Sequence, residues 1–288
     1  MRYYFGLAVG ITAISFTASL IRLSEAPALT IASLRMAITV LLLLPALVAF
    51  EGRAALALTR RDLLLCLLSG IFLAFHFAFW TVSLGYTSVA SSLVFVSVHP
   101  VFVALLGWAL FRDRPSGWVA AGIAMSWLGS LLIGFHDLQV GGSSLLGDAL
   151  AIAGAAAMVG YLLIGSAVRA RRGFLTYSVL VYAACAVSIA GMAALTGTSL
   201  AIPSSRDLAI FVALAVATVG GHTVFNWVLR HLHPSVVAVS FVAEPAGGAL
   251  LAWAILGEGI GVATAAGGLV MLLGIYLAAR GSQKARPS

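Results

Sequence analysis

The apolar residues of this chain gather into ten long runs that are separated by short polar stretches. Each run has about the 20 residues that an α-helix needs to cross the roughly 30 Å hydrocarbon core of a bilayer. A helix satisfies its backbone hydrogen bonds within its own segment, so it is the structure expected of such a run in lipid. The predicted spans are residues 3–21, 28–50, 62–85, 88–111, 116–135, 145–168, 174–196, 207–229, 234–256 and 260–280.

The composition places the whole chain in a membrane. Apolar residues make up 62% of the 288 residues and charged residues only 9%, whereas a soluble domain has about 25% charged residues. The chain is therefore predicted to be an all-α polytopic membrane protein. Its net charge of +7 does not indicate nucleic-acid binding, because the basic residues are scattered at the ends of the apolar runs and form no continuous patch.

The basic residues also predict the orientation of the chain. All of the 16 lysines and arginines except Arg22, Arg35 and Arg206 fall on the side of the membrane on which the N-terminus would lie. Because basic loops are enriched in the cytoplasm, both termini are predicted to be cytoplasmic. We expect a multi-pass protein of a bacterial-type inner membrane.

The second half of the chain repeats the first at an offset of 145 residues. The two copies, residues 3–140 and 145–282, hold five predicted spans each. Because five is an odd number, the second copy enters the membrane from the opposite side, so the two copies are predicted to be inverted repeats. The offset matches His99 and Pro100 with Glu244 and Pro245, Gly122 with Gly267, Gly129 with Gly274, Arg61 and Asp62 with Arg206 and Asp207, and Phe16 with Tyr161.

Glu244 and Pro245 lie together in the middle of an apolar span, where both are costly. A carboxylate at a helix centre costs roughly 2.5 to 3.5 kcal/mol, and a proline inside a helix about 3 kcal/mol. The mirror positions hold His99 and Pro100. Both prolines are predicted to break their helices, and broken helices near the midplane are where transporters bind substrate. Glu244 is then either a structural acceptor, which we favour, or a group that takes up and releases a proton.

Two further pairs of residues lie four positions apart on one helix, His76 with Trp80 and His222 with Asn226. Such pairs share a helix face and predict walls of a substrate site; hydrogen bonding between helices and ordinary packing are the alternatives for each residue. Arg35 lies about seven residues inside its span, roughly 10 Å along the helix. It is expected to snorkel outward as a structural anchor, with substrate contact as the alternative. The candidate substrate-binding residues are Phe16, His76, Trp80, His99, Tyr161, His222, Asn226 and Glu244.

The last span of each copy carries glycines at a spacing of seven residues, Gly122 with Gly129 and Gly267 with Gly274. Small residues at such spacings form seams along which membrane helices pack closely. These two spans are therefore predicted to be a scaffold or a dimer face.

The motifs that identify a family are Leu34-Arg35-Met36-Ala37, Arg112-Asp113-Arg114-Pro115 followed by Gly122 and Gly129, and Glu244-Pro245 with Gly257-Glu258-Gly259. Over nearly the whole chain they resemble the EamA type of the drug/metabolite transporter superfamily. The resemblance implies a ten-helix exporter whose central cavity is lined by helices 1, 3, 4, 6, 8 and 9. The aromatic-rich core is most similar to that of the YddG-type exporters of aromatic amino acids. His99 departs from the pattern, because the first copy lacks the glutamate that precedes the proline in the second.

The function that this resemblance implies is export of amino acids, aromatic and other neutral ones, or of related small metabolites, by alternating access. Export of other metabolites or drugs is the alternative, and an intramembrane enzyme or a channel is a more distant one. The sequence has no His-Glu-x-x-His helix and no mid-span aspartate, so no enzyme is predicted. We expect no cofactor, metal or nucleic-acid partner, only a small-molecule substrate and the lipid bilayer, in a monomer or weak homodimer.

Overall fold

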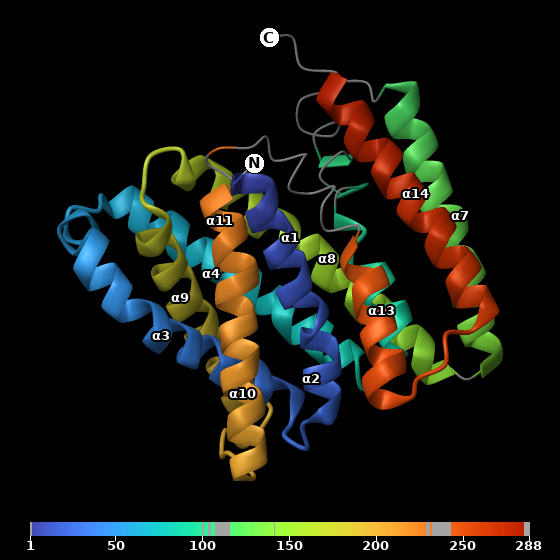
Figure 1. Ribbon diagram of the computed structural model, residues 1–288, viewed down its shortest axis with the longest axis horizontal. Coiled ribbons are helices and arrows are strands. Elements are labelled where there is room, and N and C mark those ends of the chain that lie inside the picture. Colours follow the sequence, from blue (N-terminus) through green and yellow to red (C-terminus); the bar gives the residue numbers. More distant parts are fainter. Residues whose placement is uncertain are drawn as a thin grey trace.

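The chain folds into a bundle of helices joined by short loops (Figure 1). The computed structural model describes residues 2–99, 101–102, 105–106, 116–140, 142–228, 231 and 243–284, and no β-strand occurs in these ranges. The helices are α1 (Arg2–Ser15), α2 (Thr17–Leu23), α3 (Ala28–Leu56), α4 (Arg60–Ser83), α5 (Val89–Val96), α7 (Gly117–Val140), α8 (Gly142–Arg169), α9 (Phe174–Leu195), α10 (Ser205–Thr218), the π-helix η1 (Val219–Thr223), α11 (Val224–Val228), α13 (Ala243–Leu256) and α14 (Val262–Lys284).

Each of the ten predicted spans contains helix in its described residues. Bent spans are formed by α1 with α2 and by α10 with η1 and α11. Six spans are long and apolar enough to cross a membrane, and shorter apolar helices lie at Gly117–Gly129, Ala243–Leu256 and Val262–Leu277. The predicted all-α membrane fold of ten spans is thereby confirmed.

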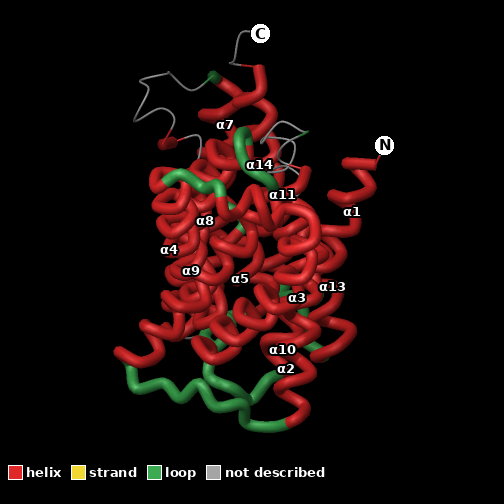
Figure 2. The backbone as a smooth tube through the Cα atoms, turned by 90° about the vertical axis from the view of Figure 1, so that its left-hand side faces the viewer, coloured by secondary structure: helices red, strands yellow, loops and turns green. Residues whose placement is uncertain are grey.

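The chain crosses the bundle repeatedly from one end to the other. The start of α1 and the end of α14 lie at the same end, which we call the terminal end (Figures 1 and 2). The loops 57–59 and 170–173 also lie there, whereas the loops 24–27, 84–88, 196–204 and 257–261 lie at the opposite end. This alternation gives the two five-helix repeats opposite directions through the bundle.

The third helix of each repeat begins with the same capping arrangement. The Thr59 hydroxyl accepts a hydrogen bond from the Asp62 backbone amide at 3.1 Å and donates to the Asp62 carboxylate at 2.9 Å. Ser204 and Asp207, which lie at the mirror positions, make the same two bonds at 3.1 and 2.7 Å. A hydroxyl at this position satisfies an amide that a helix start leaves unpaired. The same local sequence signal thus starts α4 at the terminal end and α10 at the opposite end.

The glycines of α7 and α14 form the predicted close-packed seam, and these helices lie side by side at one edge of the bundle (Figure 1). A Cβ added at Gly129 would lie 2.5 Å from the Gly267 carbonyl oxygen, and one added at Gly274 would lie 2.6 Å from that of Gly122. The 145-residue offset matches Gly129 with Gly274 and Gly122 with Gly267, so the two contacts are equivalent under the repeat. The seam is therefore antiparallel and two-fold symmetric, as inverted repeats require.

The seam predicts how two glycine substitutions will differ. Gly129→Ala places a methyl group against the α14 backbone, so we expect it to lower the free energy of unfolding by about 1 to 3 kcal/mol. Gly191→Ala in α9 is the matched control, because a Cβ there meets no atom within 4 Å. We expect the control to be neutral or slightly stabilising. Thermal unfolding of the purified proteins in detergent measures both, and equal melting temperatures would contradict the close contact.

Candidate functional site

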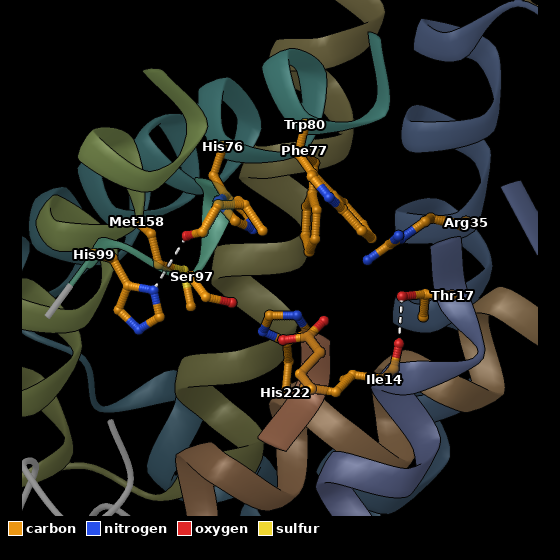
Figure 3. A pocket seen from close by; sticks show the side chains of 12 residues that line it. Ile14, Thr17, Arg35, His76, Phe77, Trp80, Ser97, His99, Met158 and His222 are labelled. Carbon is orange, nitrogen blue, oxygen red and sulfur yellow. Dashed lines mark hydrogen bonds between the residues drawn. The ribbon is translucent and has the colours of Figure 1, made fainter. Parts of the chain in front are cut away.

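A cavity lies between the two repeats and is lined by side chains from both of them (Figure 3). The space open to the centre of a water molecule is about 30 Å³, which is room for about two waters. Binding of any larger molecule therefore requires the surrounding helices to separate. The cavity is lined by Ile14, Thr17, Arg35, His76, Phe77, Trp80, Val96, Ser97, His99, Met158, His222 and Glu244.

One wall of the cavity is formed by α4, which presents His76 and Trp80 to it. Their rings are stacked with centroids 6.3 Å apart and an angle of 13° between the planes. His76 Nδ1 lies 3.0 Å from the Gly154 carbonyl oxygen of α8. A carbonyl only accepts, so Nδ1 carries the hydrogen, and Nε2 of the neutral ring is left as an acceptor.

His222 reaches the cavity from the π-helix η1, which interrupts the span formed by α10 and α11. An α-helix with such an extra residue has wider turns, and π-turns of this kind occur often at functional sites. Gly221 lets α1 approach closely, because a Cβ there would lie 2.3 Å from Ile14 Cγ2. The His222 ring meets Phe77 edge to face at 5.3 Å. The π-turn therefore sets His222 directly against the α4 wall.

The mirror residues His99 and Glu244 both line the cavity. Helix α5 ends at Val96. The Val96 carbonyl oxygen lies 3.4 Å from His99 Nδ1, and the Val96 side chain also lines the cavity. Glu244 is in the first turn of α13, and Pro245 follows it. The predicted helix break at Pro100 lies outside the described residues.

Arg35 lines the cavity, whereas its place in the sequence predicted a structural anchor that points outward. Its side chain is 1% exposed and points into the cavity (Figure 3). The guanidinium carbon lies 4.0 Å from the centre of the Phe77 ring. The expectation that Arg35 snorkels outward is therefore wrong, because its charged group stacks on an aromatic ring in the protein interior. Its position far inside an apolar span was the signal that pointed to this role.

Tyr161 and Asn226 do not line the cavity but join helices beside it. The Tyr161 hydroxyl donates to the Asn226 side-chain oxygen at 2.9 Å. The Asn226 amide donates to the hydroxyls of Ser178 at 3.1 Å and Tyr182 at 3.4 Å. Both polar groups of this buried amide are thus engaged by the protein itself.

Phe16 also lies away from the cavity lining. It occupies the break between α1 and α2, and 40% of it is exposed. The next residue, Thr17, faces the cavity instead and donates to the Ile14 carbonyl oxygen at 2.6 Å. The bend therefore turns Thr17 rather than Phe16 inward.

An ion-pair cluster joins the loops at the terminal end. Asp62 accepts from Arg172 at 2.6 Å and from Arg171 at 3.0 Å. Nearby, the Glu51 carboxylate at the end of α3 accepts from the Thr176 amide and hydroxyl at 2.9 and 2.8 Å. These bonds tie α3 and α4 of the first repeat to the start of α9 in the second.

A second group of bonds joins the loops at the opposite end. Arg22 pairs with Glu258 at 2.7 Å and donates to the Leu84 carbonyl oxygen at 2.6 Å. Glu258 also accepts from the Val89 amide at 3.1 Å. Contacts between the repeats therefore lie on both sides of the cavity, and opening either end must break one group of them.

Comparisons with known proteins agree with the repeat and the fold. The sequence model of the EamA-like transporter family matches residues 3–135 and 145–280. An uncharacterized transporter from Archaeoglobus fulgidus is 25% identical to this chain over 214 residues, which are 73% of each chain. A crystal structure of a protein with 18% sequence identity covers 100% of this chain and 99% of its own, with a TM-score of 0.69. At that identity the last similarity shows the fold alone.

The bonds of Asn226 predict that this residue braces the helices. Asn226→Ala leaves the hydroxyls of Tyr161, Ser178 and Tyr182 without this partner, so we expect a loss of about 1 to 3 kcal/mol of stability. Substrate affinity per folded molecule should stay unchanged, since Asn226 does not line the cavity. Thr12→Ala, on the exposed face of α1, is the control and should change stability by less than about 0.5 kcal/mol. Unchanged unfolding with weakened binding would instead make Asn226 a substrate ligand.

Proposed function

Because the chain belongs to the EamA-like transporter family, we propose that it exports amino acids, aromatic and other neutral ones, across a bacterial-type inner membrane. Membership makes the chain a transporter with a small-molecule substrate, and not an enzyme. The amino-acid substrate, the direction of transport and the membrane are parts of the proposal.

The observation that carries the amino-acid proposal is the chemistry of the central cavity. Among the described residues of the lining, Glu244 is the only acidic one, and a carboxylate suits the ammonium group of an amino acid. The stacked rings of His76 and Trp80 offer an aromatic wall for the side chain, with the flexible Met158 beside it. A binding site of this kind combines a few polar groups with an adaptable apolar surface.

The positions of the polar contacts support transport by alternating access. The cavity is lined by residues of both repeats, and the repeats are joined at the terminal end and at the opposite end by separate groups of bonds. Inverted repeats can rock so that one group opens while the other stays closed. The small cavity of this conformation would then widen when substrate enters.

The first test uses the aromatic wall. Trp80→Ala removes ring area from the cavity but leaves Glu244 in place, so we expect exchange of L-phenylalanine to fall about 3- to 10-fold relative to L-alanine. Radiolabelled counterflow in proteoliposomes measures this ratio. Trp127→Ala on α7 is the control, because that ring is 59% exposed on the outside of the bundle, and it should leave the ratio unchanged. Equal losses for both amino acids in Trp80→Ala would remove the ring from substrate recognition.

A second test addresses the orientation. The terminal end carries Arg53, Arg60, Arg61, Arg169, Arg171 and Arg172. By the positive-inside rule, this excess of arginine supports a cytoplasmic position for that end. Both native cysteines are buried, so a single added cysteine reports its own side. In intact cells an impermeant thiol reagent should label Ala201→Cys, in the 196–204 loop, and spare Ala57→Cys, in the 57–59 loop. The reverse pattern would place the termini outside.

A further inference from the structure

Arg35 presents a positive charge that forms no salt bridge with an acidic group of the described chain. Its Nε and Nη1 atoms are buried and have no hydrogen-bond partner. Among the described residues, the ion pairs involve Arg22, Arg171 and Arg172 but not Arg35. Its one cationic contact is the stacking on the Phe77 ring at 4.0 Å.

Keeping such a group in the interior is expensive for the ligand-free protein. A buried charge loses its hydration, and this loss is offset when hydrogen bonds and an opposite charge replace the water. The ring of Phe77 supplies only part of that replacement, because a cation over an aromatic face gains electrostatic attraction without a hydrogen bond. The free N–H groups of Arg35 are therefore available to hydrogen-bond an acceptor that enters the cavity.

The other polar residues around the cavity do not duplicate this role. His76 uses its Nδ1 hydrogen on the Gly154 carbonyl oxygen, so the neutral ring turns an acceptor towards a ligand. Glu244 in its ionised form also only accepts. The Thr17 hydroxyl donates to the Ile14 carbonyl oxygen of its own helix. The donors Trp80 Nε1 and Ser97 Oγ of the lining are also buried without a partner. Among the described lining residues, Arg35 is therefore set apart by its positive charge and by its fork of N–H groups.

We propose that Arg35 binds the carboxylate of the substrate, so that the cavity takes zwitterionic α-amino acids and rejects the corresponding amines and amides. A guanidinium is a planar fork of N–H donors that matches the two oxygens of a carboxylate. This inference rests on the proposed function and names the group that the transported molecule must carry.

The arrangement of the cavity fits an amino acid lying across it. Arg35 comes from α3 on one side, and His99 and Met158 lie on the other, with Trp80 and Phe77 between them (Figure 3). With its carboxylate at Arg35 and its ammonium at Glu244, the substrate supplies a group of opposite charge to each of these two buried side chains. An amine leaves Arg35 without its acceptor and adds a second cation to the same space, which is a penalty against the wrong ligand.

The experiment compares three compounds that share one side chain. Unlabelled L-phenylalanine, its amide and phenethylamine compete with radiolabelled L-phenylalanine in counterflow into proteoliposomes. In the wild-type protein we expect L-phenylalanine to compete about 10- to 100-fold more strongly than the other two, the ratio that one charge-assisted pair supports. Arg35→Met should bring this ratio close to one, and Arg35→Lys, which keeps a charge but not the fork, should give an intermediate value.

Arg169→Met is the matched control for the removal of a buried arginine. Arg169 is also buried, but it donates to the backbone oxygens of Asn226 and Arg172 and does not line the cavity. We expect this variant to lower the yield or the melting temperature while the competition ratio of the folded protein stays at the wild-type value. A structural role of Arg35 would likewise change the amount of folded protein and not the ratio.

The outcomes separate this inference from the proposed function. If the wild-type protein exchanges L-phenylalanine but the amide and the amine compete equally well, Arg35 does not read the carboxylate, while amino-acid transport stands. The same conclusion follows if Arg35→Met keeps the wild-type ratio or if Arg169→Met loses it. If the wild-type protein exchanges none of the neutral amino acids, the proposed function fails and this inference falls with it. When Arg35→Met yields no folded protein, the wild-type ratio and Arg35→Lys decide.

Discussion

A polar group placed between membrane helices cannot turn to water, so it must find its partner within the protein. This constraint accounts for the buried side-chain bonds between the helices. The Thr17 hydroxyl returns to the Ile14 carbonyl oxygen, and the amide of Asn226 is shared among hydroxyls of α8 and α9. Backbone and side chains obey the same rule, which is why the chain is helical and why its polar residues cluster.

In the central cavity some buried polar groups, among them Nε and Nη1 of Arg35, have no hydrogen-bond partner within the protein. Arg35 and Glu244 are the arginine and the carboxylic acid of the described cavity lining, yet they form no ion pair with each other. They come from α3 and α13, which belong to different repeats. A molecule that carries both a carboxylate and an ammonium group can give Arg35 and Glu244 a partner each, whereas the helices alone do not. The incomplete pairing thus links the fold of two fused repeats to the proposed recognition of a zwitterion.

Much of this architecture could be predicted from the sequence, because lipid makes hydropathy and charge strong signals. The ten spans, the inverted repeat and the inward positions of His76, Trp80, His99, His222 and Glu244 followed from apolar runs, one offset and helical spacing. The side chains of Phe16, Arg35 and Tyr161 could not be placed in this way. Their direction depends on the bend at Phe16, on the ring of Phe77 and on the Asn226 side chain of α11, all of which are set by tertiary packing.

The symmetric seam between α7 and α14 has a consequence for how the two repeats can diverge. In a pair of identical units that face each other across a two-fold axis, each glycine position would occur in two contacts. A single substitution would then disturb both contacts. In the fused chain Gly129 and Gly274 each serve one contact, so each is tested by selection separately. The seam already shows the difference, because Ser126 bonds to the Gly122 carbonyl oxygen while its mirror residue, Met271, has no hydroxyl. Fusion thus freed each copy to acquire its own chemistry on a shared frame.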